Sequence, residues 1–163
     1  MRSNIAKLIR QSPLLMALIS TLLSPALMFS ATPALAKEPL AEITVWHSPS
    51  CGCCTKWINH LEQYGFPVRS HARHDVAMIK HRLSVPDKLA SCHTAMVDGY
   101  VIEGHVPAED IERLLKERPF VRGLSVPGMP AGSPGMEMGD RVDPYEVISF
   151  DDDGKTEVFS RHP

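Results

Sequence analysis

The sequence has no excess of basic residues and too few apolar residues in a row to form a long hydrophobic span. Its 163 residues include 17 Lys or Arg and 19 Asp or Glu, for a formal charge of −2. Nucleic acid is therefore not an expected partner, because its binding normally requires a basic surface. With 44% apolar and 22% charged residues, the chain also lacks the composition of disordered proteins. Its length suits one domain.

The longest apolar stretch, Leu14–Phe29, contains Pro25 and is shorter than the roughly 20 residues that span a bilayer. Basic residues precede it, and Ala34-Leu35-Ala36 follows as a small-x-small cleavage site. This pattern predicts a signal peptide over residues 1–36 and a mature chain from Lys37; a membrane anchor is the alternative. Cleavage would remove three of the 17 basic residues and no acidic residue, so the formal charge would fall from −2 to −5.

Soft metal ligands are numerous for so short a chain. The sequence has 4 Cys, 8 His and 8 Met, and thiolate, imidazole and thioether groups are ligands for copper and zinc. All four cysteines follow the predicted cleavage site. In an oxidising compartment such as the periplasm, unprotected thiols become disulfides, so the pairing or metal binding of these cysteines is the central question.

Strand and helix patterns alternate along residues 37–163, which we expect to form a single domain. We predict strands over residues 41–47, 67–71, 94–97 and 100–103, and helices over residues 54–64, 76–83 and 107–118. A segment with six Gly or Pro in twelve positions, residues 128–139, is expected to be irregular, and residues 145–150 and 156–160 to form a terminal hairpin. This order predicts an α/β, thioredoxin-like fold: a central mixed sheet flanked by helices, with a C-terminal Gly/Pro/Met loop and hairpin.

Three cysteines, Cys51, Cys53 and Cys54, lie at the start of the first predicted helix, where the helix N-terminus favours thiolates. A bridge between Cys53 and Cys54 would be strained, because adjacent Cα atoms are only about 3.8 Å apart. At least one of these thiols therefore needs another partner. Cys92 is the candidate, since the segment entering the third strand of a thioredoxin-like fold passes beside the first helix.

Several chemistries suit four such cysteines. They can form two structural disulfides, for instance Cys51 with Cys54 and Cys53 with Cys92, which is one of three connectivities. A dithiol oxidoreductase needs only Cys51 and Cys54, and Cys53 would compete for every mixed disulfide. Zinc is also possible, although the tight CxCC differs from the usual separated CxxC pairs. Clustered thiolates suit Cu(I) best, because they can bridge several ions.

Methionines in the Gly/Pro-rich segment are candidate thioether ligands. Met129, Met136 and Met138 show no apolar periodicity, so they do not form the buried stripe of a helix. Methionine is a soft ligand that suits an oxidising compartment. The alternative is a mobile loop that carries methionines without a metal role.

Two histidines, His93 and His105, are expected to face the cysteines, with His47 as the third candidate. The alternative for each is a histidine with no ligand role. The others are expected on the surface or in a frayed C-terminus: His60, His71, His74, His81 and His162.

Three segments together resemble the CopG-type periplasmic copper-resistance family. They are SPSCGCCTKW, LASCHTAMVDGYVIEGHVPAEDI, and GLSVPGMPAGSPGMEMG followed by DPYEV. The resemblance covers residues 43–162. It implies a thioredoxin-like fold, a periplasmic location and copper bound by four thiolates, with two methionines as accessory ligands: Cys51, Cys53, Cys54, Cys92, Met129 and Met136. The resemblance gives no support for His47 as a metal ligand. Met138 is an additional methionine that the resemblance does not assign as a ligand.

The combined prediction is a periplasmic copper-binding protein for copper resistance or homeostasis. It would bind Cu(I), several ions in a thiolate cluster, and its other partners would be periplasmic copper-handling proteins, with no membrane contact after cleavage. Storage, delivery and interconversion of Cu(I) and Cu(II) all remain open. The alternative function is a periplasmic thiol-disulfide oxidoreductase that acts on protein substrates.

Overall fold

The computed structural model describes residues 39–163. The predicted signal peptide and its cleavage site lie outside the described residues. Within residues 39–163, no helix is long and apolar enough to cross a membrane.

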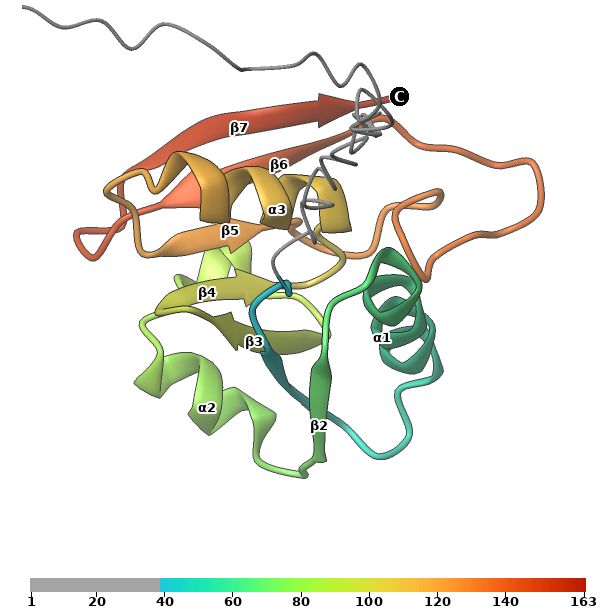
Figure 1. Cartoon of the computed structure of the whole chain (residues 1–163). Coiled ribbons are helices and arrows are strands. Elements are labelled where there is room, and N and C mark those ends of the chain that lie inside the picture. The colour runs from blue at the N-terminus through green and yellow to red at the C-terminus, as the bar shows by residue number, and fades with distance from the viewer. Residues whose placement is uncertain (1–38) are drawn as a thin grey trace, which may run out of the picture. The chain divides into compact units, whose positions relative to one another are not determined.

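Seven strands form one mixed sheet in the order β2-β1-β3-β4-β5-β6-β7 (Figure 1). The β1/β2 and β4/β5 pairs are parallel, and the other neighbouring pairs are antiparallel. The elements are β1 (Ile43–His47), α1 (Gly52–Tyr64), β2 (Val68–Ala72), α2 (Val76–Arg82), the 3₁₀ helix η1 (Asp87–Leu89), β3 (His93–Val97), β4 (Tyr100–Glu103), α3 (Ala108–Glu117), β5 (Gly123–Ser125), β6 (Tyr145–Phe150) and β7 (Thr156–His162).

The observed order confirms the predicted α/β class and mixed sheet. Each predicted strand and helix is present within a few residues of its predicted bounds. The prediction missed η1 and β5, which are only three residues long. Three further strands, β5, β6 and β7, continue the sheet beyond β4. The thioredoxin-like assignment therefore concerns only the part from β1 to α3, and for that part it stays a prediction.

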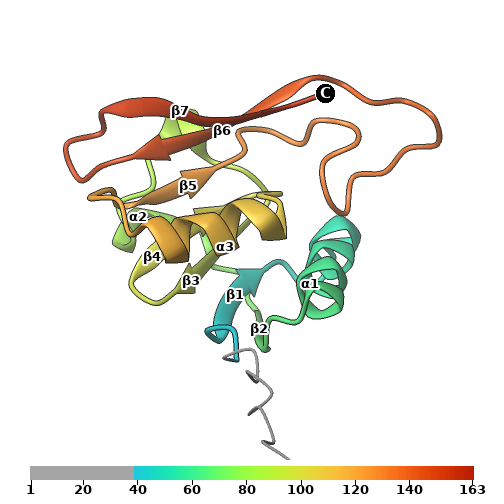
Figure 2. The same ribbon diagram turned by 45° about the horizontal axis from the view of Figure 1, so that its top comes forward.

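Helices cover both faces of the sheet (Figure 2). Adjacent residues of a strand point to opposite faces, and the neighbours Val101 and Ile102, both fully buried, belong to two different core clusters. The larger cluster includes Trp57 and Leu61 of α1 and Ile111 of α3. The smaller cluster, on the other face, includes Leu89 of η1 and Phe150 of β6. Each face of the central strands is therefore packed, which fixes their register.

A glycine and a buried tryptophan fix the ends of α1. Gly65 ends the helix with φ 106°, a conformation that favours glycine, and its N–H donates to the carbonyls of Leu61 and Glu62. Nearer the N-terminus, the fully buried Trp57 donates its indole N–H to the Val106 carbonyl at 2.8 Å. The first turn of α1, with its cysteines, is thereby held against the segment between β4 and α3.

The C-terminus is ordered, so the predicted fraying at His162 is wrong. His162 ends β7, stacks on Tyr145 with ring centroids 4.9 Å apart, and places Nε2 2.7 Å from Asp110 Oδ2. Asp110 is buried in the first turn of α3. Burial of its carboxylate requires hydrogen-bonding partners, and His162 supplies one.

The Gly/Pro-rich segment between β5 and β6 is irregular, as predicted. Its one β-bridge pairs Met138 with Arg141. Figure 1 shows this segment leaving the sheet and passing close to α1 before it returns to β6.

Candidate metal centre

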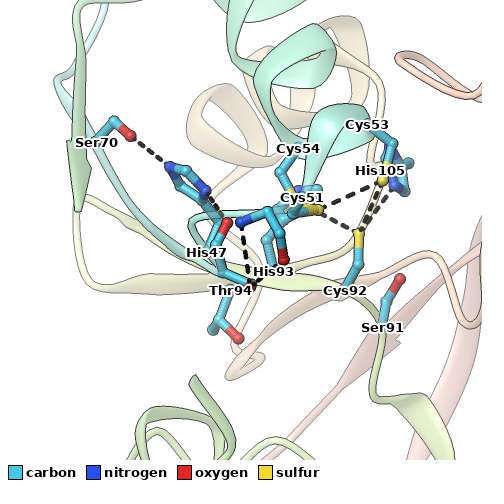
Figure 3. The surroundings of a disulfide bond; sticks show 12 residues. His47, Cys51, Cys53, Cys54, Ser70, Ser91, Cys92, His93, Thr94 and His105 are labelled. Atoms are coloured by element: carbon cyan, nitrogen blue, oxygen red, sulfur yellow. Dashed lines mark hydrogen bonds between the residues drawn. A yellow bond between two sulfur atoms is a disulfide. The ribbon is translucent and has the colours of Figure 1, made fainter. Parts of the chain in front are cut away.

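The four cysteines meet at one end of the sheet (Figure 3). Their sulfur atoms all lie within 4.8 Å of one another. Cys51, Cys53 and Cys54, here called the cysteine turn, occupy the N-cap and first turn of α1. Cys92 directly precedes β3. Because β1 leads into the cysteine turn and its last residue, His47, pairs with His93 at the start of antiparallel β3, the two segments are brought together.

The cysteine turn is partly oxidised. Cys51 and Cys54 form a disulfide with Cα atoms 5.4 Å apart, whereas Cys53 and Cys92 are free. Cys53 Sγ lies 3.5 Å from Cys51 Sγ and 4.0 Å from Cys92 Sγ. The structure thus contains one of the two bridges of the disulfide alternative, and the other two cysteines remain as neighbouring thiols.

Cys92 also contacts two imidazole rings. Its Sγ lies 3.1 Å from His93 Nδ1 and 3.0 Å from His105 Nε2. These three residues, here called the strand side, also have their donor atoms within 4.8 Å of one another. Burial, with the Cys53 sulfur as the next cause, raises the pKa of the Cys92 thiol to about 12. In the metal-free protein Cys92 is therefore a protonated thiol.

The His105 ring has a fixed tautomer. Its Nδ1 lies 2.7 Å from the Pro134 carbonyl, which can only accept a hydrogen bond, so Nδ1 carries the proton. Burial lowers the pKa of His105, and the neutral ring keeps a lone pair on Nε2. That lone pair accepts from the Cys92 thiol, and it would face a metal ion that replaced the thiol proton.

The His93 ring is fully buried beside Trp57, with ring centroids 4.2 Å apart. Burial, followed by the nearby His105 and Lys80, lowers the pKa of His93 well below its ordinary value. His93 Nδ1 lies within hydrogen-bonding distance of the Cys92 sulfur that also contacts His105. His93 Nε2 is buried and has no hydrogen-bond partner among the described residues.

Sulfur and neutral imidazole donors fit a soft or borderline metal ion such as copper or zinc. The two possible ligand groups share Cys92: one consists of the four cysteines, and the other is the strand side. The bond from His105 to a backbone carbonyl is also the usual arrangement of a metal-binding histidine. The structure thus brings together all six predicted cysteine and histidine ligands: Cys51, Cys53, Cys54, Cys92, His93 and His105.

The remaining candidate, His47, lies beside the centre but belongs to neither ligand group. Its Nε2 bonds to Ser70 Oγ and its Nδ1 to the Ser48 carbonyl, each at 2.8 Å. His71, His74 and His81 are exposed as expected. His60 is not a freely solvated side chain, because it is half-buried and accepts the N–H of Ala108 at the start of α3.

The Gly/Pro-rich loop reaches the centre through its backbone. The Pro134 carbonyl holds His105, and the Gly128 carbonyl accepts from the Ser91 hydroxyl beside Cys92. Met129 is 54% exposed and Met136 is half-buried. Their proposed role as ligands stays a prediction.

Gly135 allows the loop to lie directly against α1. With φ +85°, a Cβ at this position would lie 2.7 Å from Trp57 N and 2.8 Å from Cys53 O. Such contacts are too short for any side chain. A close backbone approach therefore explains this glycine, and it brings the neighbouring Pro134 carbonyl to His105.

Two groups that form hydrogen bonds with the candidate ligands or their neighbours were not predicted from the sequence. The Pro134 carbonyl is one, and no sequence pattern reveals such a backbone contact. Glu103 is the other: it is fully buried at the end of β4, and its backbone carbonyl and carboxylate bond to Val126 and to Ser91. Its signal was visible as an acidic residue at the end of an apolar strand, directly before Gly104.

Known proteins resemble the chain over this whole region. A family model described as a protein of unknown function, DUF411, matches residues 89–136, which include the strand side and most of the loop. The solved structure of Copper resistance protein copG, form 2, is 49% identical, with a TM-score of 0.73 over 77% of this chain and 100% of that chain.

The chain belongs to the CopG family of copper resistance proteins. Form 1 of the same CopG protein gives 48% identity and a TM-score of 0.72, over 76% of this chain and 98% of that chain. No protein of curated function matches. Membership of the CopG family confirms the resemblance that the CxCC, SCH and GMP to GSPGM segments predicted.

Proposed function

We propose that this CopG-family protein binds copper at the candidate metal centre and serves copper resistance or homeostasis in the periplasm. The observation that carries the proposal is the set of four cysteine sulfurs within 4.8 Å of one another, next to two imidazole rings. The names of the two related structures support copper as the metal. The predicted signal peptide supports the location.

In its reduced form, the centre offers four sulfur donors, and we propose that they hold more than one Cu(I) ion. Thiolates can bridge soft ions, and one Cu(I) ion in a low-coordinate site does not use four thiolates. Binding requires Cys92 to lose its proton, since the thiolate is the ligand. Met129 and Met136 are proposed as accessory ligands from the loop.

We also propose one redox step at the cysteine turn. The Cys51 and Cys54 thiols lose two protons and two electrons and form the disulfide seen in the structure. Two Cu(II) ions each accept one electron and become Cu(I). Cys53 and Cys92 remain as thiols in this state, so sulfur ligands are still present for the product.

Anaerobic titration tests this function. Fully reduced protein, titrated with Cu(I) against a competing chelator, should bind more than one ion per chain. The matched control is the same protein with the Cys51–Cys54 disulfide intact, which should bind fewer ions. A stoichiometry of one or less in the reduced protein would exclude the cluster, and preferential retention of zinc would contradict the choice of metal.

A thiol-disulfide oxidoreductase is the second candidate, because a Cys51–Cys54 disulfide at a helix N-terminus is also the active group of such enzymes. Cys53 Sγ, at 3.5 Å from Cys51 Sγ, would attack each mixed disulfide and weakens this alternative. Insulin reduction separates the candidates. Activity comparable to that of a thioredoxin and unaffected by copper would favour the oxidoreductase.

A further inference from the structure

A buried carboxylate lies directly behind the strand side. Glu103 ends β4 and has no exposed surface. One oxygen, Oε1, accepts the backbone N–H of Ser91 at 2.6 Å and the ammonium group of Lys80 at 2.5 Å. The other oxygen accepts the Thr94 hydroxyl at 2.7 Å. Three donors therefore converge on one carboxylate.

The carboxylate lies on the opposite face of the sheet from the ligands. His93 contacts Trp57 of α1, whereas Thr94, the next residue of β3, bonds to Lys80 of α2 at 2.9 Å. Glu103 is the register partner of Thr94. Its hydrogen bonds thus hold the chain at Ser91 and Thr94, on either side of Cys92 and His93.

The donors require a carboxylate in particular. Two oxygens with several lone pairs can accept all three donors, whereas an amide at this position would offer one acceptor oxygen. Hydrogen bonds to a charged acceptor are also shorter and stronger than neutral ones. Lys80, whose side chain is 15% exposed, balances the buried charge. Since an apolar pair often replaces such an ion pair without loss of stability, stability alone does not account for this arrangement.

We propose that Glu103 is a positioning residue of the metal centre. By holding Ser91 N–H and the Thr94 hydroxyl, it keeps the Cys92 thiol between Cys53 and the two imidazoles. The copper part of this inference rests on the proposed function. The positioning itself is a property of the metal-free protein, and it can be measured there.

The first test measures cysteine reactivity in metal-free protein with the Cys51–Cys54 disulfide intact. Alkylation rates of Cys92 and Cys53 are compared by mass spectrometry, so that Cys53 serves as an internal reference. In the double variant Lys80→Met/Glu103→Leu, which leaves no unpaired buried charge, the ratio of Cys92 to Cys53 rates should rise about fivefold, as expected for the loss of one ordinary hydrogen bond.

Two single variants complete the series. Glu103→Gln keeps one acceptor oxygen and should give a ratio between those of the wild type and the double variant. Glu146→Gln is the matched control, because it makes the same change in the exposed Glu146–Arg161 pair and should leave the ratio unchanged. A folded double variant with the wild-type ratio would overturn the proposal. Should that variant not fold, a wild-type ratio in Glu103→Gln would overturn it.

The second test measures copper affinity in the reduced proteins. The double variant should bind Cu(I) about 10-fold to 100-fold more weakly, the usual cost of losing a group that orients a ligand, while its urea midpoint shows a folded protein. Unchanged affinity together with an unchanged alkylation ratio would contradict the positioning role. If wild-type protein itself does not bind copper, the proposed function fails, and the alkylation ratio still decides the role of Glu103.

Discussion

The two sides of the metal centre are built in different ways. The cysteine turn is local, with three cysteines within four positions at the start of α1. The strand side is assembled from β3 and the segment after β4, through strand register and the Pro134 and Glu103 contacts. The first side carries the disulfide, whereas the second holds a thiol and two neutral imidazoles. Formation of the Cys51–Cys54 disulfide therefore removes two thiol donors from the cysteine turn, whereas the strand side keeps its donors.

The largest effect should come from Cys92, which belongs to both ligand groups. We expect Cys92→Ser to weaken Cu(I) binding by more than about 100-fold. Loss of a residue that only orients a ligand costs up to about 100-fold, and loss of the ligand itself should cost more. Cys53→Ser removes a thiol from the cysteine turn alone and should cost less. Competition titration of both reduced variants gives the comparison, with insulin reduction measured in parallel. Wild-type copper affinity in Cys92→Ser would place Cys92 outside the site and leave the cysteine turn to act alone.

The next effect concerns the loop, which contacts both sides: Gly135 lies against α1, and the Pro134 carbonyl bonds to His105. Gly135→Ala adds a Cβ against the backbone of Trp57 and Cys53, and this overlap should lower the free energy of unfolding by about 1–3 kcal/mol beyond the loss caused by the positive φ alone. Gly139→Ala is the control, since Gly139 has φ +62° but no atom within 4 Å of the added Cβ. Urea denaturation measures both. Equal losses in the two variants would mean that the close approach of the loop contributes nothing.

The pH dependence of stability should distinguish the strand side from the cysteine turn. Burial lowers the pKa of His93 and His105 in the folded protein, while both would titrate near about 6.5 in the unfolded chain. As the pH falls below that value, the unfolded chain takes up protons that the folded chain does not. The free energy of unfolding should therefore decrease, by at most about 1.4 kcal/mol per pH unit for each histidine, until the pH reaches the folded pKa.

Urea denaturation of metal-free protein at several pH values measures this slope. His93→Gln should make the slope shallower than in the wild type, with His71→Gln on exposed β2 as the control. A slope that His93→Gln leaves unchanged would show that His93 is not held neutral by burial.

The smallest effect on stability is expected for the thioethers of the loop. Met129→Leu/Met136→Leu conserves volume, so it should change the free energy of unfolding by less than about 1.5 kcal/mol. Copper affinity should fall if these sulfurs are ligands. Met78→Leu, on exposed α2, is the matched control. Native copper affinity and a native rate of change between Cu(I) and Cu(II) would assign the site to cysteines and histidines alone.

The contrast between the two sides also explains what could be predicted from the sequence. The cysteine turn was readable because spacing alone places Cys51, Cys53 and Cys54 on one helical turn. The meeting of Cys92 with His105 depends on strand pairing, and it followed from the expected order of elements. The short β5, the Pro134 carbonyl and the buried Glu103 were not predicted, because tertiary contacts determine them. The error at His162 has the same origin, since its partner Asp110 is 52 positions away.

The loop that holds His105 begins and ends in paired strands. β5 and β6 hydrogen-bond to each other, so both ends of residues 126–144 are anchored in the same sheet. Changes of length inside such a closed loop cost little loop-closure entropy, and the four cysteines belong to other elements. The loop can therefore change in evolution, or be exchanged by engineering, while the four cysteines stay in place, and the Pro134 contact to His105 changes with it. For the proposed copper site, a single insertion in this loop would then alter access to the centre.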